Sequence, residues 1–304
     1  MYTHFETISR IPKQRSDIDG ERIVFYNAPL YRRRGRFMSK RHRIEDGKNF
    51  KISHVDPEDT GDFKDRDECE EATRADLERL AELQERLYVD NRTSVLIVLQ
   101  AIDTGGKDGT IKHVFRGLNP QGCQVTSFKK PTPEELDHDF LWRINRALPA
   151  KGDIGIFNRS HYEDVLIVRV HDYVPKKVWS KRYDYINTFE KLLTDENTVI
   201  LKFFLLISKD EQKKRLEARL ADKEKTWKFD PGDLNERKYW NDYMDAYQDM
   251  IRKCSAPHAP WYIVPANKKW YRNYVVANAL VKTMSKLDLK LPKPTFDPSK
   301  VKVV

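Results

Sequence analysis

The sequence has few cysteines and no long apolar run. Its three cysteines, Cys69, Cys123 and Cys254, lie far apart and form no C-x-x-C pair, so neither a disulfide framework nor a zinc site is expected. The longest apolar stretches, such as residues 95–99 and 203–207, are much shorter than the roughly 18 residues that span a bilayer. The N-terminus also lacks the apolar segment of a secretory signal. These absences predict a cytoplasmic protein that does not insert into a membrane.

The sequence also lacks a uniform excess of positive charge, although its formal net charge is +9. Residues 1–43 hold 11 Lys or Arg and 4 Asp or Glu, a net +7, whereas the remainder carries only +2. A nearly neutral body argues against nucleic-acid binding. The basic N-terminal extension either binds a polyanion or is a solvated arm, and we favour the arm because short basic runs have little specificity. The chain therefore divides into an extension at 1–43, one domain at 44–290 and a tail at 291–304.

The hydrophobic pattern alternates between strands and helices, and an apolar content of 39% is sufficient for a core. Residues 94–100, SVLIVLQ, are apolar at nearly every position, as in a parallel strand that is buried on both faces. Leucines at helical spacing precede this strand, and capping boxes at Thr132–Glu135 and Ser208–Glu211 begin later helices. Further strands are predicted at 124–128, 153–157, 199–207 and 261–264. The pattern predicts a three-layer α/β fold with a parallel sheet of about five strands, helices on both faces, and ligands at the carboxyl ends of the strands.

A phosphate-binding loop is predicted directly after the first buried strand. The segment AIDTGGKDGT, residues 101–110, runs from this strand into a helical stretch, which is the setting that a P-loop requires. Its glycines allow backbone N–H groups to turn toward phosphate oxygens, and the helix N-terminus adds a positive dipole. Lys107 supplies a mobile cation that follows the transferred phosphoryl group. The predicted phosphate-binding residues of the loop are Gly105, Gly106, Lys107, Gly109 and Thr110.

Two departures from the common P-loop pattern concern metal binding. Ala101 stands at the first glycine position, and Asp108 replaces the Ser or Thr that normally holds Mg²⁺. The metal must therefore be held by other residues. Asp103, inside the loop, is a candidate catalytic carboxylate that either binds Mg²⁺ against the phosphates or orients an acceptor oxygen.

Several segments of the chain resemble the polyphosphate kinase 2 family, in the family's order. They are IDTGGKDGTIKHVFRGLNPQG, DFLWR, FNRSHYEDVL, WKF and APWYIVPANKKWYRN, and the resemblance spans about residues 50–290. It implies a P-loop kinase core related to thymidylate kinase, covered by a helical lid and assembled as a homo-oligomer. It also implies phosphoryl transfer between inorganic polyphosphate and nucleoside mono- or diphosphates.

A second motif, NRSHYED at residues 158–164, follows the predicted strand 153–157, where P-loop enzymes place a metal-associated carboxylate. Family members often carry aspartate at the position of Asn158, and the asparagine version resembles the branch that accepts both nucleoside mono- and diphosphates. Asp164 is then the candidate ligand of Mg²⁺, and Glu163 the residue that orients the acceptor. Arg159 can neutralise charge on the phosphoryl group, because a guanidinium offers paired donors. The predicted nucleotide-binding residues are Asn158, Arg159 and Glu163.

The other two polar residues of this motif are interpreted as structural. Ser160 can cap the next helix, and a lone histidine such as His161 is usually not a ligand.

A run of basic residues within 209–232 corresponds to the lid of the family. Arg215 and Arg219 are four residues apart, on one side of a predicted helix, and they precede Trp227 and Lys228. A lid that closes cations over the phosphates would also exclude water. We therefore interpret Arg215, Arg219 and Lys228 as phosphate-binding, and the other lysines of this region as a solvated face.

Together these features predict a polyphosphate-dependent kinase that phosphorylates AMP or ADP with Mg²⁺ as cofactor, with GMP and GDP as further candidate acceptors. An ATP-dependent nucleoside monophosphate kinase would use the same loop and lid with another donor. A polyanion-binding module without catalysis is disfavoured. Asp103, Glu163 and Asp164 would repel a polyanion unless metal lay between them, and metal indicates chemistry.

Overall fold

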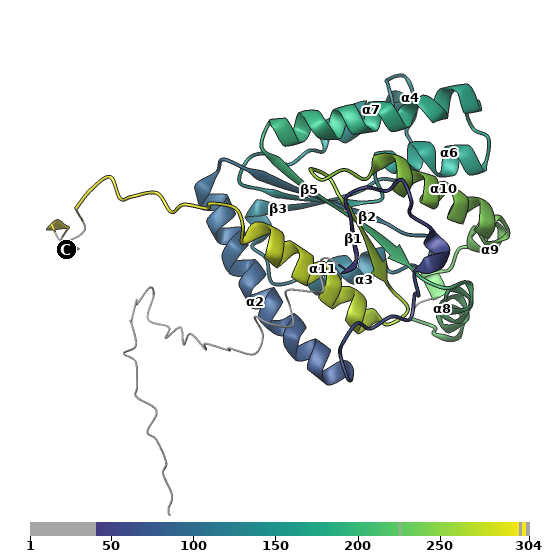
Figure 1. Cartoon of the computed structure of the whole chain (residues 1–304), viewed down its shortest axis with the longest axis horizontal. Coiled ribbons are helices and arrows are strands. Elements are labelled where there is room, and N and C mark those ends of the chain that lie inside the picture. Colours follow the sequence, from purple (N-terminus) through teal and green to yellow (C-terminus); the bar gives the residue numbers. More distant parts are fainter. Residues whose placement is uncertain (1–40, 225, 298–299, 302–304) are drawn as a thin grey trace, which may run out of the picture.

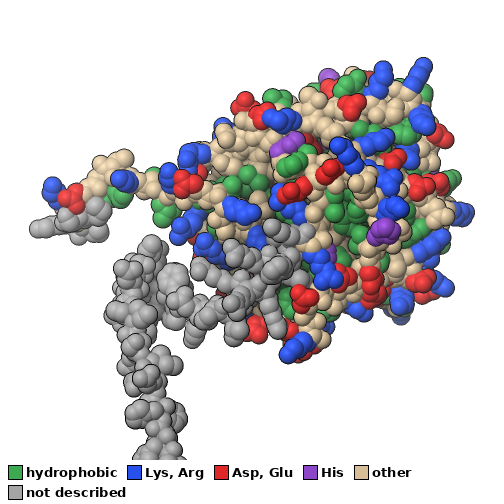
Figure 2. Space-filling view, in the orientation of Figure 1, with side chains coloured by type: hydrophobic (Ala, Val, Ile, Leu, Met, Phe, Trp, Pro, Cys, Tyr) green, Lys and Arg blue, Asp and Glu red, His purple; other side chains and the backbone are tan. Residues whose placement is uncertain are grey.

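The computed structural model describes residues 41–224, 226–297 and 300–301 (Figure 1). Most of the predicted basic extension, residues 1–40, lies outside the described residues. On the face that Figure 2 shows, Lys and Arg side chains are interspersed with Asp and Glu. This mixture agrees with the nearly neutral body that the sequence predicts.

A six-stranded mixed sheet forms the centre of the described structure, with the strand order β1-β6-β5-β2-β4-β3. Five strands run parallel, and β1 pairs antiparallel with β6 at one edge. Every residue of β2 is buried, because β2 has neighbours on both sides in the sheet and helices above and below. The strands are β1 (Arg43–Ile44), β2 (Ser94–Gln100), β3 (Cys123–Ser127), β4 (Ile154–Asn158), β5 (Thr198–Leu206) and β6 (Trp261–Pro265).

All five predicted strands are confirmed, and their ends differ by at most one residue. The sequence did not predict β1, because a strand of two residues has no periodicity to detect. Just before β1, His42 is buried, and its Nε2 lies 2.8 Å from the hydroxyl of Tyr271. The boundary predicted between residues 43 and 44 therefore cuts through a strand, and the domain includes residues 42 and 43.

Helices cover both faces of the sheet, which gives the predicted three layers (Figure 1). The longer helices are α2 (Arg66–Asp90), α3 (Lys107–Val114), α7 (Lys176–Asp195), α8 (Lys209–Ala221), α10 (Trp240–Cys254) and α11 (Lys269–Met284). On one face α11 packs against α2 and α3, and on the other α7 packs against β5 and α10. Within the described ranges, no helix has the length and apolar character needed to cross a bilayer.

Short helices join these elements. The α-helical ones are α4 (Pro133–Leu136), α5 (Trp142–Arg146), α6 (Ile167–Val170) and α9 (Gly232–Glu236). The 3₁₀ helices are η1 (Ile52–His54), η2 (Pro120–Gly122), η3 (His161–Val165), η4 (Thr226–Lys228) and η5 (Arg237–Tyr239).

The helix starts follow the predicted capping chemistry in part. Thr132 and Glu135 form both hydrogen bonds of a capping box at the start of α4, as predicted. At the start of α8, only one of the two hydrogen bonds of the second predicted capping box forms. The Ser208 hydroxyl accepts from the Glu211 N–H, but the Glu211 carboxylate accepts from Arg215 one turn later instead of returning to the cap. Ser208 still satisfies one of the free N–H groups of α8.

Candidate active site

The predicted P-loop connects β2 to α3 at the carboxyl end of the sheet. Two of its residues have positive φ, 64° at Thr104 and 105° at Gly106, so the chain reverses sharply before α3 begins. The hydroxyl of Thr104 is buried and has no hydrogen-bond partner among the described residues. No sequence signal pointed to Thr104, whose hydroxyl is an unused donor inside the predicted P-loop.

Lys107 is the first residue of α3, and its side chain folds back over the loop. Its Nζ donates a 2.8 Å hydrogen bond to the carbonyl of Ala101, and only 9% of the residue is exposed. Burial lowers the pKa of Lys107, while Asp103 acts in the opposite direction. The ammonium group therefore lies in the loop with part of its water already removed, and it would interact strongly with a phosphate.

Thr110 lies one turn into α3 and is fully buried. Its hydroxyl donates to the carbonyl of Gly106, within the helix. The structure thus uses this hydroxyl to hold the first turn of α3, so the side chain is turned away from the phosphate role that the sequence predicted.

Asp103 and Arg159 bring the P-loop and the second motif together. The guanidinium of Arg159 donates to Asp103 Oδ1 at 2.7 Å, across the ends of β2 and β4. Arg159 has a φ of 63°, and its N–H donates to the carbonyl of Leu99, so the strained backbone is anchored to β2. Burial would lower the pKa of Arg159, but Glu163 and Asp103 together raise it. These predicted site residues therefore form one charged cluster.

Glu163 lies on η3 and completes this cluster. Burial raises the pKa of Glu163, Arg159 and Lys107 oppose the increase, and Asp103 adds to it. The amide group of Gln100, the last residue of β2, lies 3.0 Å from the carboxylate. A buried carboxyl group whose pKa is raised in this way binds a proton more readily than an exposed one does.

Asp164, the next residue on η3, lies against two arginines. Its Oδ1 accepts a 2.9 Å hydrogen bond from Arg182 on α7, and its Oδ2 lies 3.9 Å from Nη2 of Arg143. Burial raises the pKa of Asp164 to about 6, although both arginines lower it. Because both oxygens already face guanidinium groups, Asp164 fits the predicted role of a metal ligand less well than Asp103 does.

Asn158, at the end of β4, donates from Nδ2 to Asp108 Oδ1 at 2.7 Å. This hydrogen bond joins the second motif to the first turn of α3. Asp108 occupies the position at which other P-loops have a hydroxyl for Mg²⁺, so Asn158 and Asp108 together replace that hydroxyl with an amide and a carboxylate. The sequence could not predict their contact, since 50 residues separate them.

A buried polar network supports η3 from the interior. Lys202, in the middle of β5, donates to Glu190 Oε2 at 2.5 Å, to the Tyr162 hydroxyl at 2.9 Å and to a backbone carbonyl at 2.6 Å. His161 lies 3.2 Å from Glu190 Oε1, and Ser160 accepts from the Tyr162 N–H. The structural interpretation of Ser160 and His161 is therefore confirmed.

Helix α8, which the sequence assigns to the lid, contacts the P-loop directly. The Gln212 side chain donates to the carbonyl of Asp103 at 3.0 Å. The guanidinium of Arg215 donates to the Glu211 carboxylate and to the backbone carbonyls of Thr104, Gly105, Ala266 and Asn267. Its nitrogens are thus occupied within the protein, so these contacts favour support of the loop over the phosphate binding that the sequence predicted.

The other two predicted lid cations are farther along the chain. Arg219 Nη1 lies 3.6 Å from Asp233 Oδ2, at the start of α9, and about a quarter of the Arg219 side chain is exposed. Burial and the nearby Asp103 raise the pKa of Asp233 to about 6, which indicates that this segment approaches the P-loop. The backbone of Lys228 belongs to η4, but its side chain lies outside the described part of the chain.

The residues at the loop suit a metal that is held jointly by protein and substrate. Among the described residues, no group of three or more His, Cys, Asp or Glu side chains could hold a metal ion without other ligands. Mg²⁺ is commonly bound by one or two carboxylates together with substrate phosphates. Asp103 fits this arrangement, because Arg159 occupies its Oδ1 and leaves Oδ2 available.

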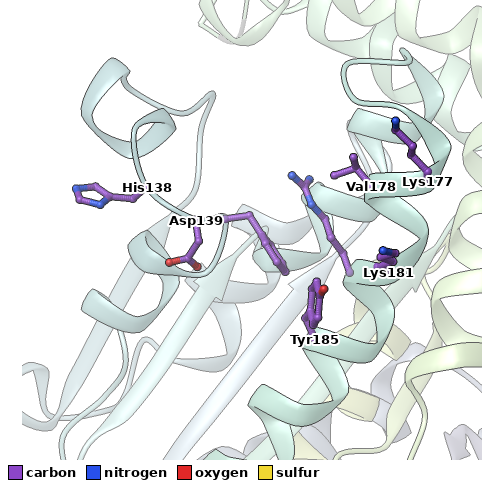
Figure 3. Close-up of a pocket in the computed structure, with 8 residues that line it drawn as sticks. His138, Asp139, Lys177, Val178, Lys181 and Tyr185 are labelled. Carbon is purple, nitrogen blue, oxygen red and sulfur yellow. The ribbon is translucent and has the colours of Figure 1, made fainter.

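A surface cavity of about 460 Å³ is lined in part by Arg182, the partner of Asp164 (Figure 3). It separates the segment that carries His138 and Asp139 from the first half of α7, which contributes Lys177, Lys181 and Tyr185. Its lining contains no P-loop residue, so it is not the phosphate site. Arg182 connects the cavity with η3, since it lines the cavity and donates to Asp164.

The chain matches the family model described as polyphosphate kinase 2 over residues 63–292. It is 50% identical over 263 residues to the AMP/ADP-polyphosphate phosphotransferase of Meiothermus ruber, a match that covers 86% of this chain and 98% of the relative. It is 45% identical to the ADP-polyphosphate phosphotransferase of Rhodopseudomonas palustris, over 84% of this chain and 93% of the relative.

A solved structure agrees with these matches. The polyphosphate kinase 2 of Arthrobacter aurescens superposes with a TM-score of 0.83 at 47% sequence identity, over 86% of this chain and 93% of that chain. The fold, the order of the motifs and the P-loop cluster are all consistent with the family that the motifs indicate. The chain belongs to the polyphosphate kinase 2 family.

Proposed function

We propose that the protein transfers a phosphoryl group from inorganic polyphosphate to AMP and to ADP, with Mg²⁺ as its cofactor. The observation that carries the proposal is the cluster of Asp103, Lys107, Arg159 and Glu163 where β2 and β4 end. The relative from Meiothermus ruber supports both acceptors, since its name includes AMP and ADP. The products are then ADP and ATP, and the reaction is reversible in principle.

The cluster suits phosphoryl transfer because this chemistry depends on positioning and on stabilisation of charge more than on covalent intermediates. The N–H groups at the start of α3 and the Lys107 ammonium bind phosphate oxygens. Arg159 presents paired donors to the transferred group, and its ion pair with Asp103 fixes its orientation. Asp103 Oδ2 would hold Mg²⁺, and the bound ion would offset the negative charge of the phosphates.

The acceptor lies on the side of η3. Glu163, with its raised pKa, orients the acceptor oxygen and can take up a proton from it. Asn158 contributes an uncharged amide at the same edge, so it does not repel the acceptor phosphate as a carboxylate would. GMP and GDP are further candidate acceptors. We place the protein in the cytoplasm, as its sequence predicts, and infer that it is the homo-oligomer that its resemblance to the family implies.

The test is nucleotide formation by the purified protein with Mg²⁺ and polyphosphate, with AMP, ADP, GMP or GDP as acceptor. We expect ADP from AMP and ATP from ADP, both dependent on polyphosphate. A parallel reaction supplies AMP and ATP without polyphosphate. Rapid ADP formation in that reaction alone would identify an ATP-dependent nucleoside monophosphate kinase and contradict the proposal.

A further inference from the structure

Arg272, in the first turn of α11, lies against the P-loop. Only 2% of the residue is exposed. A methyl group placed on Gly106 would lie 2.0 Å from Arg272 Nη1, and one placed on Gly109 would lie 3.3 Å from Nη2. The guanidinium therefore occupies the space that side chains at these two positions would need, and it contacts the backbone that begins α3.

The positive charge of Arg272 has no carboxylate partner in the described ranges. Its Nε and Nη2 donate to the amide oxygen of the neighbouring Asn273, at 3.2 and 2.8 Å. A second cation lies nearby, since Arg215 Nη1 is 3.6 Å from the same methyl position on Gly106. Burial, together with Arg215, lowers the pKa of Arg272 to about 10.

Other arginines of the protein contrast with this arrangement. Arg169, on α6, donates to Asp249 at 2.8 Å, and Arg182 donates to Asp164 at 2.9 Å. Arg215 is paired with Glu211. A buried charge normally has such a partner, because its desolvation is otherwise uncompensated.

The surroundings make the charge of Arg272 still less favourable in the free protein. The N-terminus of α3 carries a partial positive charge from its free N–H groups, and cations are stabilising only at the opposite end of a helix. Arg272, Arg215, Lys107 and this helix end thus gather positive charge around one loop. A phosphate group in the loop would add negative charge beside these cations, and it would give Arg272 the anionic partner that no described carboxylate provides.

We propose that Arg272 is a charge-supplying and positioning residue of the phosphate site, whose guanidinium acts through Gly106 and Gly109 and is balanced by the bound phosphate. The inference rests on the proposed binding of polyphosphate at the P-loop. Arg272 does not touch the reacting atoms. It raises the affinity of the loop for phosphate at the expense of the stability of the free protein.

The test compares Arg272→Met, which keeps much of the side-chain volume without the charge, with Arg272→Lys, which keeps the charge. The matched control is Arg169→Met, which removes a guanidinium that has a carboxylate partner. For each protein we would measure the melting temperature without ligand, and the Kd for tripolyphosphate by calorimetry in the presence of Mg²⁺.

We expect Arg272→Met to bind tripolyphosphate at least tenfold more weakly than the wild type, with an unchanged or higher melting temperature. Arg272→Lys should bind within about threefold of the wild type. Arg169→Met should melt lower and bind normally. The increase in melting temperature that saturating ligand causes should also be smaller in Arg272→Met.

Several results would overturn the inference. They are normal binding by Arg272→Met, equal weakening in Arg272→Lys, and an Arg272→Met protein that melts well below the wild type or does not fold. A wild-type protein that does not bind tripolyphosphate would overturn the proposed function as well. Normal wild-type binding together with normal binding by Arg272→Met would overturn only the role of Arg272.

Discussion

Replacement of Lys202 by methionine tests whether the buried network holds the catalytic segment. Lys202 is fully buried, and the Glu190 side chain is 2% exposed. Methionine has a similar length and no charge, so the change removes the hydrogen bonds of the ammonium without leaving a large cavity. The Glu190 carboxylate would then remain in the interior beside Tyr162 and His161, without its cation.

The expected loss of stability follows from this burial. Removal of one partner of a buried ion pair costs about 3–5 kcal/mol, because the other charge stays desolvated. For a domain of this size, that loss lowers the melting temperature by roughly 6–20 °C. The double replacement of Lys202 by Met and Glu190 by Leu removes both charges, so it should recover most of the loss. Since Tyr162 lies next to Glu163 on η3, kcat should fall in the single variant and recover in part in the double variant.

The dependence on pH gives a second readout. Burial alone would raise the pKa of Glu190, but Lys202 and the hydrogen bonds to the carboxylate hold it below its ordinary value of 4.5. In the wild type the ionised carboxylate therefore contributes stability above pH 4.5, and this contribution is lost as the pH falls through the lowered pKa. Without Lys202 we expect the pKa of Glu190 to rise. The stability deficit of Lys202→Met should then be largest at pH 8 and smaller at pH 5.

Urea unfolding of both variants at pH 5 and pH 8 measures these effects. Lys191→Met is the control, since Lys191 pairs with Asp195 on the exposed surface of α7. The control should unfold much like the wild type, because exposed ion pairs contribute little. A Lys202→Met protein as stable as this control, or a deficit that does not change with pH, would refute the reasoning.

Four other changes test the site itself. Lys107→Met should reduce phosphoryl transfer by at least a hundredfold with an unchanged melting temperature, and substantial turnover by the folded variant would contradict the site. Asp103→Asn should also lower kcat strongly and raise the Mg²⁺ concentration needed for half-maximal activity; an unchanged requirement would assign Asp103 to orienting Arg159 or the acceptor. Arg215→Ala should lower both the melting temperature and kcat because it releases the loop carbonyls, whereas a selective rise in the KM for polyphosphate would return it to direct phosphate binding. Removal of residues 1–40 should leave activity with short polyphosphate unchanged, and a loss there would show that the extension completes the site.

The strands and the layers of the fold could be predicted because their signals are local. A buried parallel strand is apolar along its length, and the run from residue 94 to 100 shows this without any long-range information. β1 could not be predicted in the same way. Its two residues are fixed by pairing with β6, which follows more than 200 residues later in the chain.

The P-loop and the second motif could also be located from the sequence, because each combines residue types with a position after a strand. The contacts between the two motifs could not be predicted from the sequence. The pairs Asp103–Arg159 and Asn158–Asp108 form because β2 and β4 are neighbours in the sheet, an order that the sequence alone does not specify. Asp164 was predicted to bind metal from its place in the motif, but the arginines that face it come from α5 and α7.

The sequence correctly predicted that Arg215 and Arg219 lie four residues apart on one helix. This spacing does not predict which residues that face of the helix contacts. The first turns of α8 pack onto the P-loop, so Gln212 and Arg215 hold loop carbonyls. Arg219 lies one turn farther along and pairs with Asp233 instead. If a lid closes over the phosphates, its moving part must therefore lie after Arg215, because motion of the first two turns would break the hydrogen bonds that shape the loop.

The glycines of the P-loop show how one sequence pattern can have two physical causes. Gly106 has a φ of 105°, which a residue with a side chain rarely adopts. A positive φ is the usual reason for a glycine in a phosphate-binding loop. Gly109 has no such conformation, and a side chain there would approach the Arg272 guanidinium instead. Part of the space that these glycines leave is thus occupied by a cation from α11, more than 160 residues away in the sequence. Any substitution at Gly109 consequently changes the position of a charge as well as the shape of the loop, so its effect on phosphate affinity should depend on whether residue 272 is Arg or Met.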